Sequence, residues 1–331
     1  MAGQDPAVAG RGGRTARGGT TPMKVLLAGA SGTLGTALVP MLLASGHQVL
    51  GLTRSERGAA RLKAMGVPSL PADLMDADGL LAALKGHQAD AVIHQATAIA
   101  GAPMFHRDLY ATDALRERGT ANLLRAAAEI GARRFLTQSF FLGYGYRDHG
   151  PEPVEEERPF AMPTGHRAFD RHMRSMRANE DQVLGAPGID GIALRYGMFY
   201  GPEPTTRRLM SMLRRRMLPV PRPSGTTAPI HIHDAASATV AALERGHAEQ
   251  AYNIVDDRPV LFADYVRTLA AAAGAPEPVT VPGPVFRALP YLHALMVDTG
   301  IRVSNAKAKR RLGWRPAFPT YREGLETLAD G

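Results

Sequence analysis

The sequence contains no cysteine and one tryptophan, and aromatic residues make up only 6% of its 331 residues. Without cysteine the chain forms no disulfide, no thiolate nucleophile and no cysteine-ligated metal site. No apolar run reaches the length that crosses a membrane, and residues 1–22 lack the apolar stretch of a secretory signal. We therefore expect a cytoplasmic protein with no membrane partner and no metal.

The positive charge is the next feature to explain, since the formal net charge is +8. Its densest group lies in one short predicted helix and comprises Arg207, Arg208, Arg214, Arg215 and Arg216. No aromatic residues alternate with these arginines, and no nucleic-acid-binding motif surrounds them. A solvated helix face, or a wall that attracts an acidic ligand, explains the cluster, so we expect no nucleic-acid partner.

Apolar strands and longer helical patterns alternate after a leader of 22 residues. The leader is rich in Gly and Arg and has little to bury, so we expect it to be disordered and take Met23 as a candidate natural start. Strands are predicted near residues 24–29, 48–53, 91–95, 134–138 and 192–195. Helices are predicted near residues 33–45, 56–65, 77–85, 108–130 and 166–184. This order predicts an α/β fold with a doubly wound parallel sheet, a Rossmann fold.

Beyond the last predicted strand, proline-rich stretches such as "LPVPRPSG" separate the elements. We assign residues 23–198 to a nucleotide-binding domain and residues 199–331 mainly to a smaller C-terminal substrate-binding lobe. Segments near 229–255 are expected to return to the nucleotide-binding core. Open α/β sheets bind ligands at the carboxyl ends of their strands, so the lobe should cover that edge.

The segment "VLLAGASGTLGTAL" places three glycines between an apolar strand and a helix. Gly29 allows a sharp turn, Gly32 removes a side chain where a pyrophosphate approaches the backbone, and Gly35 permits close packing of helix on strand. The N-terminus of the helix supplies partial positive charge for the phosphates. The pattern predicts a dinucleotide site.

The end of the second predicted strand indicates which dinucleotide is bound. A site that prefers NAD has an acid roughly 20 residues after the glycines, whereas this chain has Arg54, followed by Arg57 and Arg61. A guanidinium pairs with the 2′-phosphate of NADP through charge-assisted hydrogen bonds. The sequence therefore favours NADP(H), and the alternative is that Arg54 is a surface residue beside Glu56.

Several further segments follow in a fixed order: "GASGTLG", "ADL" at 72–74, "VIHQATA", "RFLTQS", "LRYGMFYGP" and "HIHDAASATVAAL". In this order they resemble the short-chain dehydrogenase/reductase superfamily, in its extended NAD-dependent epimerase/dehydratase branch. The resemblance implies a cofactor held by the glycine motif, by an Asp-hydrophobic pair beside the adenine and by the segment after the fourth strand. With Arg54, the expected cofactor residues are Gly29, Ser31, Gly32, Thr33, Leu34, Gly35, Asp73, Leu74, Ala96 and Thr97.

The resemblance fails at the positions where that family performs its chemistry. Alignment of the predicted helix places His172 on the family's catalytic tyrosine and Met176 on its lysine. Phe140 occupies the position of the usual serine or threonine, and Ser139 directly precedes it. The chain therefore resembles an atypical group that keeps the nucleotide site and lacks the tyrosine–lysine pair.

Three residues remain as candidate catalytic groups: Tyr144, Ser139 and His172. An imidazole titrates near neutral pH without help, but His172 also falls on an apolar stripe with Phe169 and Met173, which favours a packed histidine. Tyr144 follows the carboxyl end of a strand and aligns with a tyrosine that the family often has there. It is either a donor to a substrate carbonyl or a packing tyrosine.

The side chains expected to line the substrate site include an unusual number of flexible methionines. Met198 and Phe199 follow the sixth strand, and Met210, Met212, Leu213 and Met217 come after them. Tyr196 and Tyr200 are expected to shape the same crevice. A bulky, mostly apolar small molecule with one carbonyl suits this lining better than a nucleotide sugar does.

These features together predict an NADP(H)-dependent oxidoreductase that reduces a carbonyl or activated double bond of a small organic substrate. One alternative is a non-redox isomerase, dehydratase or cyclase that retains NADP as a bound scaffold. A second is an NADP(H)-sensing binding module without catalysis. The family resemblance also suggests a homodimer formed through the helices near 108–130 and 166–184.

Overall fold

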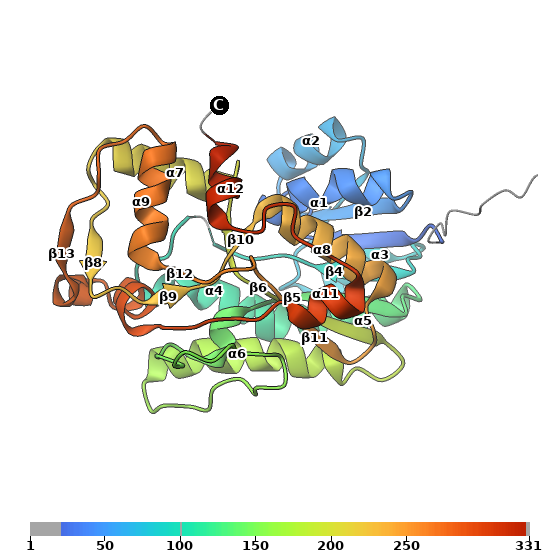
Figure 1. The fold of residues 1–331 in the computed structure, drawn as a ribbon. Coiled ribbons are helices and arrows are strands. Elements are labelled where there is room, and N and C mark those ends of the chain that lie inside the picture. Colours follow the sequence, from blue (N-terminus) through green and yellow to red (C-terminus); the bar gives the residue numbers. More distant parts are fainter. Residues whose placement is uncertain (1–20, 100, 329–331) are drawn as a thin grey trace, which may run out of the picture.

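Seven parallel strands form one sheet in the order β11-β6-β5-β4-β1-β2-β3 (Figure 1). The protein is represented by a computed structural model that describes residues 21–99 and 101–328. The strands are β1 (Lys24–Ala28), β2 (Gln48–Thr53), β3 (Ser69–Pro71), β4 (Ala91–His94), β5 (Arg134–Phe140), β6 (Asp190–Tyr196) and β11 (Gln250–Ile254). The predicted leader lies almost wholly outside the described residues.

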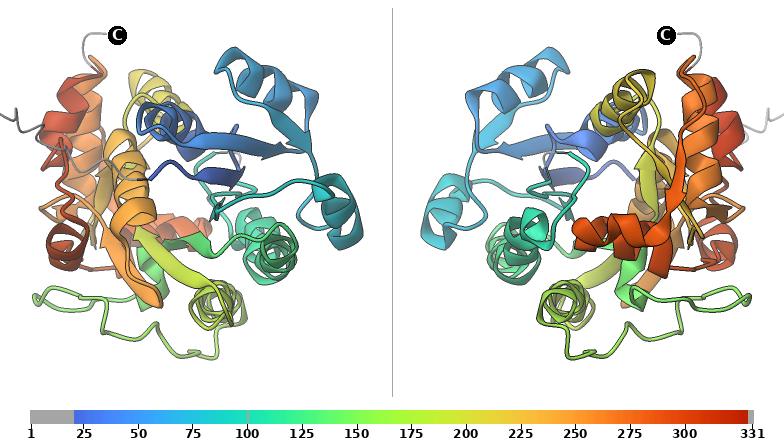
Figure 2. Two further views of the ribbon diagram at one scale, coloured as in Figure 1. Left: turned by 90° about the vertical axis from the view of Figure 1, so that its right-hand side faces the viewer. Right: turned by 90° about the vertical axis from the view of Figure 1, so that its left-hand side faces the viewer.

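Helices cover both faces of the sheet because its central strands are apolar on both sides. Val25 and Leu27 of β1 face one layer, and Leu26 faces the other. The first layer contains α1 (Thr33–Ala44), α2 (Glu56–Ala64), α8 (Ile232–Arg245) and α11 (Ala306–Leu312). The second contains α3 (Ala77–Leu84), α5 (Thr120–Glu129) and α6 (Arg167–Leu184). The two views of Figure 2 show these layers above and below the sheet, and the predicted fold class is confirmed.

The predicted helix near 108–130 consists of four consecutive pieces. A 3₁₀ turn (His106–Leu109) leads into α4 (Tyr110–Ala114), a π-helical turn (Leu115–Gly119) follows, and α5 completes the segment. The π-helical turn widens the helix by one residue and turns Arg116 toward the cavity described below. Leu115 and Leu123 are buried in the subunit's own core, so they are not available to a dimer interface.

The rest of the chain forms a lobe beside the sheet, at the left in Figure 1. Its helices are α7 (Pro204–Arg214), α9 (Phe262–Ala272), α10 (Pro290–His293) and α12 (Tyr321–Glu326). Three short strand pairs join it: β7 (Met198–Tyr200) with β10 (Pro229–His231), β8 (Val220–Arg222) with β13 (Thr280–Pro282), and β9 (Thr226–Thr227) with β12 (Val260–Leu261). Between these segments the chain crosses back to the sheet, because α8 packs against α1 and β11 pairs with β6.

Candidate functional site

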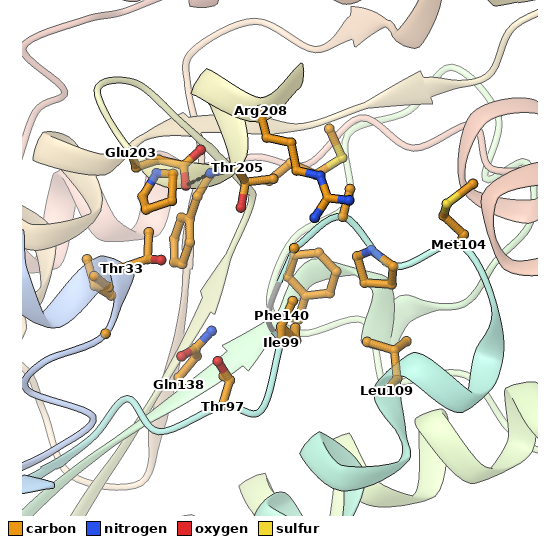
Figure 3. Close-up of a pocket in the computed structure, with 18 of the residues that line it drawn as sticks. Thr33, Thr97, Ile99, Met104, Leu109, Gln138, Phe140, Glu203, Thr205 and Arg208 are labelled. Carbon is orange, nitrogen blue, oxygen red and sulfur yellow. Dashed lines mark hydrogen bonds between the residues drawn. The ribbon is translucent and has the colours of Figure 1, made fainter. Parts of the chain in front are cut away.

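One cavity of about 1130 Å³ runs from the start of α1, past the carboxyl ends of the strands and into the lobe. Figure 3 shows the region where these parts meet, with Thr33 and Thr97 on the sheet side and Arg208 on the lobe side. All the predicted cofactor residues except Gly35 line this cavity. The sequence-derived nucleotide site and the lobe therefore share one continuous space.

The glycine motif forms the turn between β1 and α1. Gly29 has a φ of +85°, and a Cβ placed on it would lie 2.6 Å from the carbonyl carbon of Gln95. Gly32 precedes α1, and no side chain caps the helix. The first backbone N–H groups of α1 thus have no side-chain acceptor, and a pyrophosphate fits their charge and their hydrogen-bonding needs. Gly35 lies beneath the turn, where a Cβ would meet the carbonyl oxygens of Gly29 and Ala30.

Two arginines, Arg54 directly after β2 and Arg61 on α2, lie where the adenosine half of a dinucleotide would bind. Arg54 and Arg61 are both exposed and both line the cavity. The Nη1 atom of Arg61 donates a hydrogen bond to the carbonyl oxygen of Ser31 at 2.9 Å, which fixes its guanidinium beside the glycine turn. On the other side, Asp73 accepts a hydrogen bond from the backbone of Met75 at 2.9 Å, next to the buried Leu74.

The positions of the family's catalytic residues are apolar where they meet the cavity. Phe140, at the end of β5, and Met176, on α6, both line it. Gln138 is the polar residue of β5 that reaches the same space (Figure 3). At these two positions the wall of the cavity carries neither an acid nor a cation.

Polar groups approach this part of the cavity from other elements. Arg116, in the π-helical turn, and Tyr146 and Tyr291 all line the cavity. The rings of Tyr146 and Tyr291 lie edge to face with centroids 5.8 Å apart. Burial raises the pKa of both phenols, so both stay protonated at neutral pH. Arg116 counteracts this rise at each tyrosine, as a cation near a phenol must.

The substrate side of the cavity is apolar and contains several flexible methionine side chains, as the sequence suggests. Met198 and Phe199 line it, and so do Met212 and Met217 of the methionine-rich segment. Two further residues of that segment, Met210 and Leu213, are instead buried in the core of the lobe. Arg208 extends from α7 into this space toward Ile99 and Phe140 (Figure 3). Its guanidinium forms no ion pair or hydrogen bond with the described residues.

Tyr144 lies outside the cavity lining and is only 1% exposed. Its hydroxyl donates a hydrogen bond to Oδ1 of Asn253 at 2.9 Å and accepts one from Nη1 of Arg195 at 2.8 Å. Arg195 is in turn held by the carboxylate of Glu180, 2.7 Å away. Burial raises the pKa of Tyr144 to about 12. Of the two roles considered from the sequence, these contacts support packing.

His172 points away from the cavity, toward α4. It is fully buried, its Nδ1 lies 2.7 Å from Oδ2 of Asp113, and its Nε2 lies 3.1 Å from Nδ1 of His106. Burial alone would raise the pKa of Asp113, but hydrogen bonds from His172 and Ser175 hold it below its ordinary value. Ser139 is fully buried too, and its hydroxyl has no hydrogen-bond partner among the described residues.

Tyr196 and Tyr200 are also fully buried and do not line the cavity. Tyr196 bonds to Thr239 at 2.6 Å, and Tyr200 donates to Oδ2 of Asp256 at 3.0 Å. Of the residues expected at the substrate, Met198, Phe199, Met212 and Met217 are the ones that the structure brings to the cavity. Tyr196 joins β6 to α8, and Tyr200 joins β7 to the segment after β11.

The sequence reasoning did not select Arg116, Arg208 or Tyr291 as site residues. A single arginine in a long amphipathic helix carries no signal that a π-helical turn will direct it inward. Tyr291 lies in an apolar segment near the C-terminus, and its contact with Tyr146, in the loop that follows β5, cannot be predicted from the local pattern. The basic cluster that includes Arg208 is the available signal in the sequence, although a solvated helix face explains it as well as a wall for an acidic ligand does.

No helix among the described residues is long and apolar enough to cross a membrane.

The profile of the NAD dependent epimerase/dehydratase family matches residues 25–255. The chain is 32% identical over 309 residues to 3-diazoavenalumate denitrifying reductase of a Streptomyces species, which covers 92% of this chain and 99% of the relative. It is 30% identical over 265 residues to 2-alkyl-3-oxoalkanoate reductase of Stenotrophomonas maltophilia, which covers 77% of each.

Solved structures resemble the fold at lower sequence identity. UDP-glucose 4-epimerase of Thermotoga maritima, solved with UDP-glucose, matches with a TM-score of 0.74 at 20% identity, covering 93% of this chain and 98% of that one. An enzyme of Bordetella bronchiseptica, solved with NAD⁺, matches with a TM-score of 0.74 at 21% identity, covering 94% and 98%. At these identities the likeness establishes the architecture alone.

Proposed function

The chain belongs to the NAD-dependent epimerase/dehydratase family, and from that premise we propose that it is an NADP(H)-dependent oxidoreductase acting on a small, mostly apolar organic carbonyl or enone. The observation that carries the proposal is the single cavity, which joins the glycine turn to a methionine-rich lobe. A bound NADPH supplies a hydride there, while the chain's own residues bind and orient the substrate.

The choice of NADP(H) rests on the positive end of the cavity. Arg54 and Arg61 line the cavity where the adenosine ribose would lie. A site that prefers NAD has an acid at the end of β2, whereas this chain has Arg54 there. Arg61 is already positioned by Ser31, so a 2′-phosphate between the two guanidinium groups would gain charge-assisted hydrogen bonds without much reordering.

The substrate class follows from the lobe. An apolar body fits against Met198, Phe199 and Met212, and methionines adapt to varied shapes. Arg208 supplies one cation in this wall, which suits a carboxylate on the substrate. The names of two relatives, an oxoalkanoate reductase and an avenalumate reductase, both describe carboxylates and support this inference.

A second candidate is the reductive removal of nitrogen from a diazo-substituted carboxylate. The 32% identical relative is named for such a reaction. Hydride transfer to an arenediazonium ion forms a C–H bond and releases N₂, so the acceptor needs no proton. The apolar Phe140 and Met176, which align with the family's serine or threonine and its lysine, are compatible with that requirement.

The experiment offers the purified protein NADPH with a panel of 2-alkyl-3-oxoalkanoates, enones and diazo-substituted aryl carboxylates. NADPH absorbance and product mass are followed together. Oxidation of one NADPH per molecule of alcohol or saturated ketone supports the first candidate, and N₂ release with the C–H product supports the second. Conversion without net NADPH loss would instead identify a non-redox enzyme that retains its cofactor. Different affinities for NADP⁺ and NADPH without conversion of any compound would identify a sensing module.

A further inference from the structure

We propose that Tyr146, Tyr291 and Arg116 form a hydrogen-bond donor site for the substrate oxygen, in place of the family's tyrosine–lysine pair. This inference rests on the proposed carbonyl or enone reduction. The three residues come from three elements that are distant in the sequence, and all three line the cavity. Phe140 and Met176, which align with the family's serine or threonine and its lysine, line the same cavity and pack in one apolar cluster with Tyr146.

The chemistry requires such a site somewhere in this part of the cavity. When a carbonyl carbon gains a hydride, a C–H bond forms and the π-electron pair moves to oxygen, which then takes a proton from solvent to complete the alcohol. The developing oxyanion needs donors already aimed at it, because such preorganised groups are often the largest contribution to catalysis. Phe140 and Met176 can donate nothing, so the donors must come from other residues.

The two phenols and the guanidinium meet this need by geometry. Tyr146 and Tyr291 are in edge-to-face contact, and Tyr146 donates a hydrogen bond to Tyr291, since their bond raises the pKa of Tyr146 and opposes the rise in the pKa of Tyr291. The O–H of Tyr291 remains for the substrate oxygen, and Tyr291 is only 4% exposed, so water competes little for it. The side chain of Arg116 is 11% exposed and lies 3.7 Å from Asp113, beyond a strong hydrogen bond. Its remaining N–H groups are therefore available to an anion.

The scaffold around these residues holds them in place. Arg116 lies in a π-helical turn, a local departure from regular helix that is frequent at functional sites. A second π-helical turn, Ala294–Asp298, follows α10, the short helix that carries Tyr291. Asp113 also binds His172 and Ser175, so the carboxylate that orients Arg116 is itself fixed between α4 and α6. Asp113 and His172 are thus positioning residues for this donor site.

The test uses 4-nitrophenolate, an oxyanion probe whose binding is read from its absorbance, on protein saturated with NADP⁺. Its neutral analogue 4-nitroanisole measures fit alone. We expect Tyr146→Phe combined with Tyr291→Phe to lower the affinity for 4-nitrophenolate by about tenfold or more, the usual scale for hydrogen bonds to a charged group. The affinity for 4-nitroanisole should change by less than about twofold.

Matched variants control for position and for folding. Tyr110→Phe removes a phenol that does not line the cavity and stacks under Arg171. Arg118→Met removes an exposed cation from the same π-helical turn as Arg116. Neither should change 4-nitrophenolate binding, whereas Arg116→Met should weaken it, provided that each variant melts cooperatively. Loss of 4-nitrophenolate binding in Arg116→Met but not in Arg118→Met supports the assignment.

The proposal is overturned if the wild-type protein shows no preference for 4-nitrophenolate over 4-nitroanisole, or if the double tyrosine variant keeps that preference. Failure of the proposed function has a different signature. In that case no carbonyl or enone oxidises NADPH, although the preference for the phenolate depends on the two tyrosines. The two results are separable because probe binding requires no turnover.

Discussion

The Nδ1 atom of His172 lies 2.7 Å from Oδ2 of Asp113, so this side chain, which the sequence comparison aligns with the family's tyrosine, bonds to a buried carboxylate of α4. This contact joins α6 to the segment that carries Arg116. It makes His172 part of the wall behind the cavity and not a group that meets substrate.

Replacement of His172 should therefore lower the free energy of unfolding more than it lowers the affinity for the cofactor. His172→Phe leaves Asp113 buried without its nearest partner, although Ser175 still donates to it. We expect the free energy of unfolding to fall by about 2–4 kcal/mol, since breaking a buried charged contact has a cost of that order. Denaturant titration measures it, with NADPH affinity in parallel. The double variant His172→Phe with Asp113→Asn should lose less free energy of unfolding than the sum of the losses in the two single variants. A loss equal to that sum would contradict the assigned contact.

Discrimination between cofactors is expected to depend on Arg54. Arg54→Ala should remove most of an expected tenfold or greater preference for NADPH over NADH, because the 2′-phosphate loses a charge-assisted partner. Arg57→Ala is the control, since Arg57 is equally exposed on the neighbouring helix and does not line the cavity. Fluorescence titration with each cofactor provides the affinities. Equal affinities in the unaltered protein would end the assignment to NADP(H).

The neighbouring arginines of α7 offer a matched test of the substrate's charge. Arg208 lines the cavity and Arg207, next to it, does not. Arg208→Ala should raise KM for a carboxylate substrate about tenfold and leave its methyl ester nearly unchanged, while kcat changes little. Arg207→Ala should alter neither. An equal rise in KM for acid and ester would show that Arg208 acts by shape and not by charge.

Asp256 should make stability depend on pH. Burial raises the pKa of Asp256 to about 8, well above its value in an unfolded chain. Between about pH 4 and pH 8 the folded protein therefore binds more protons at this site than the unfolded chain does, so stability falls as pH rises through that window. Asp256→Asn removes the ionisation and should be stabilised relative to wild type by at least ~1 kcal/mol more at pH 8.5 than at pH 5.

Melting curves at a series of pH values provide the check on Asp256. Asp190→Asn serves as the control, because the side chain of Asp190 is 59% exposed and lies 3.9 Å from its nearest arginine, Arg134. Its stability should follow wild type across the range. Parallel pH profiles for wild type and Asp256→Asn would mean that Asp256 is already ionised in the folded protein.

The elements that follow local rules could be predicted from the sequence. The strand expected near 48–53 is β2 (Gln48–Thr53), and the helix expected near 166–184 is α6 (Arg167–Leu184), because apolar periodicity and turn residues act over a few positions. The glycine turn was predictable for the same reason: Gly29 needs its positive φ wherever β1 meets α1.

The reactive end of the cavity could not be predicted in this way. The orientation of His172 depends on Asp113, which is on another helix, and Tyr291 reaches Tyr146 only after the chain has built the whole lobe. Tyr144 illustrates the same difficulty. Its place after β5 suits a ligand site, but the buried Arg195 and Asn253 take its hydroxyl.

The return of β11 to the edge of the sheet beside β6 limits how this protein can be recombined with its relatives. A chain cut after residue 198 would lose not only the lobe but also β11 and α8, which cover one edge of the sheet and the outer side of α1. A lobe from another protein would therefore have to be grafted as separate inserts, because α8 with β11 and, later in the chain, α11 belong to the sheet and its helix layer. New substrate preferences should arise more readily through changes within those inserts than through exchange of the C-terminal third as one block.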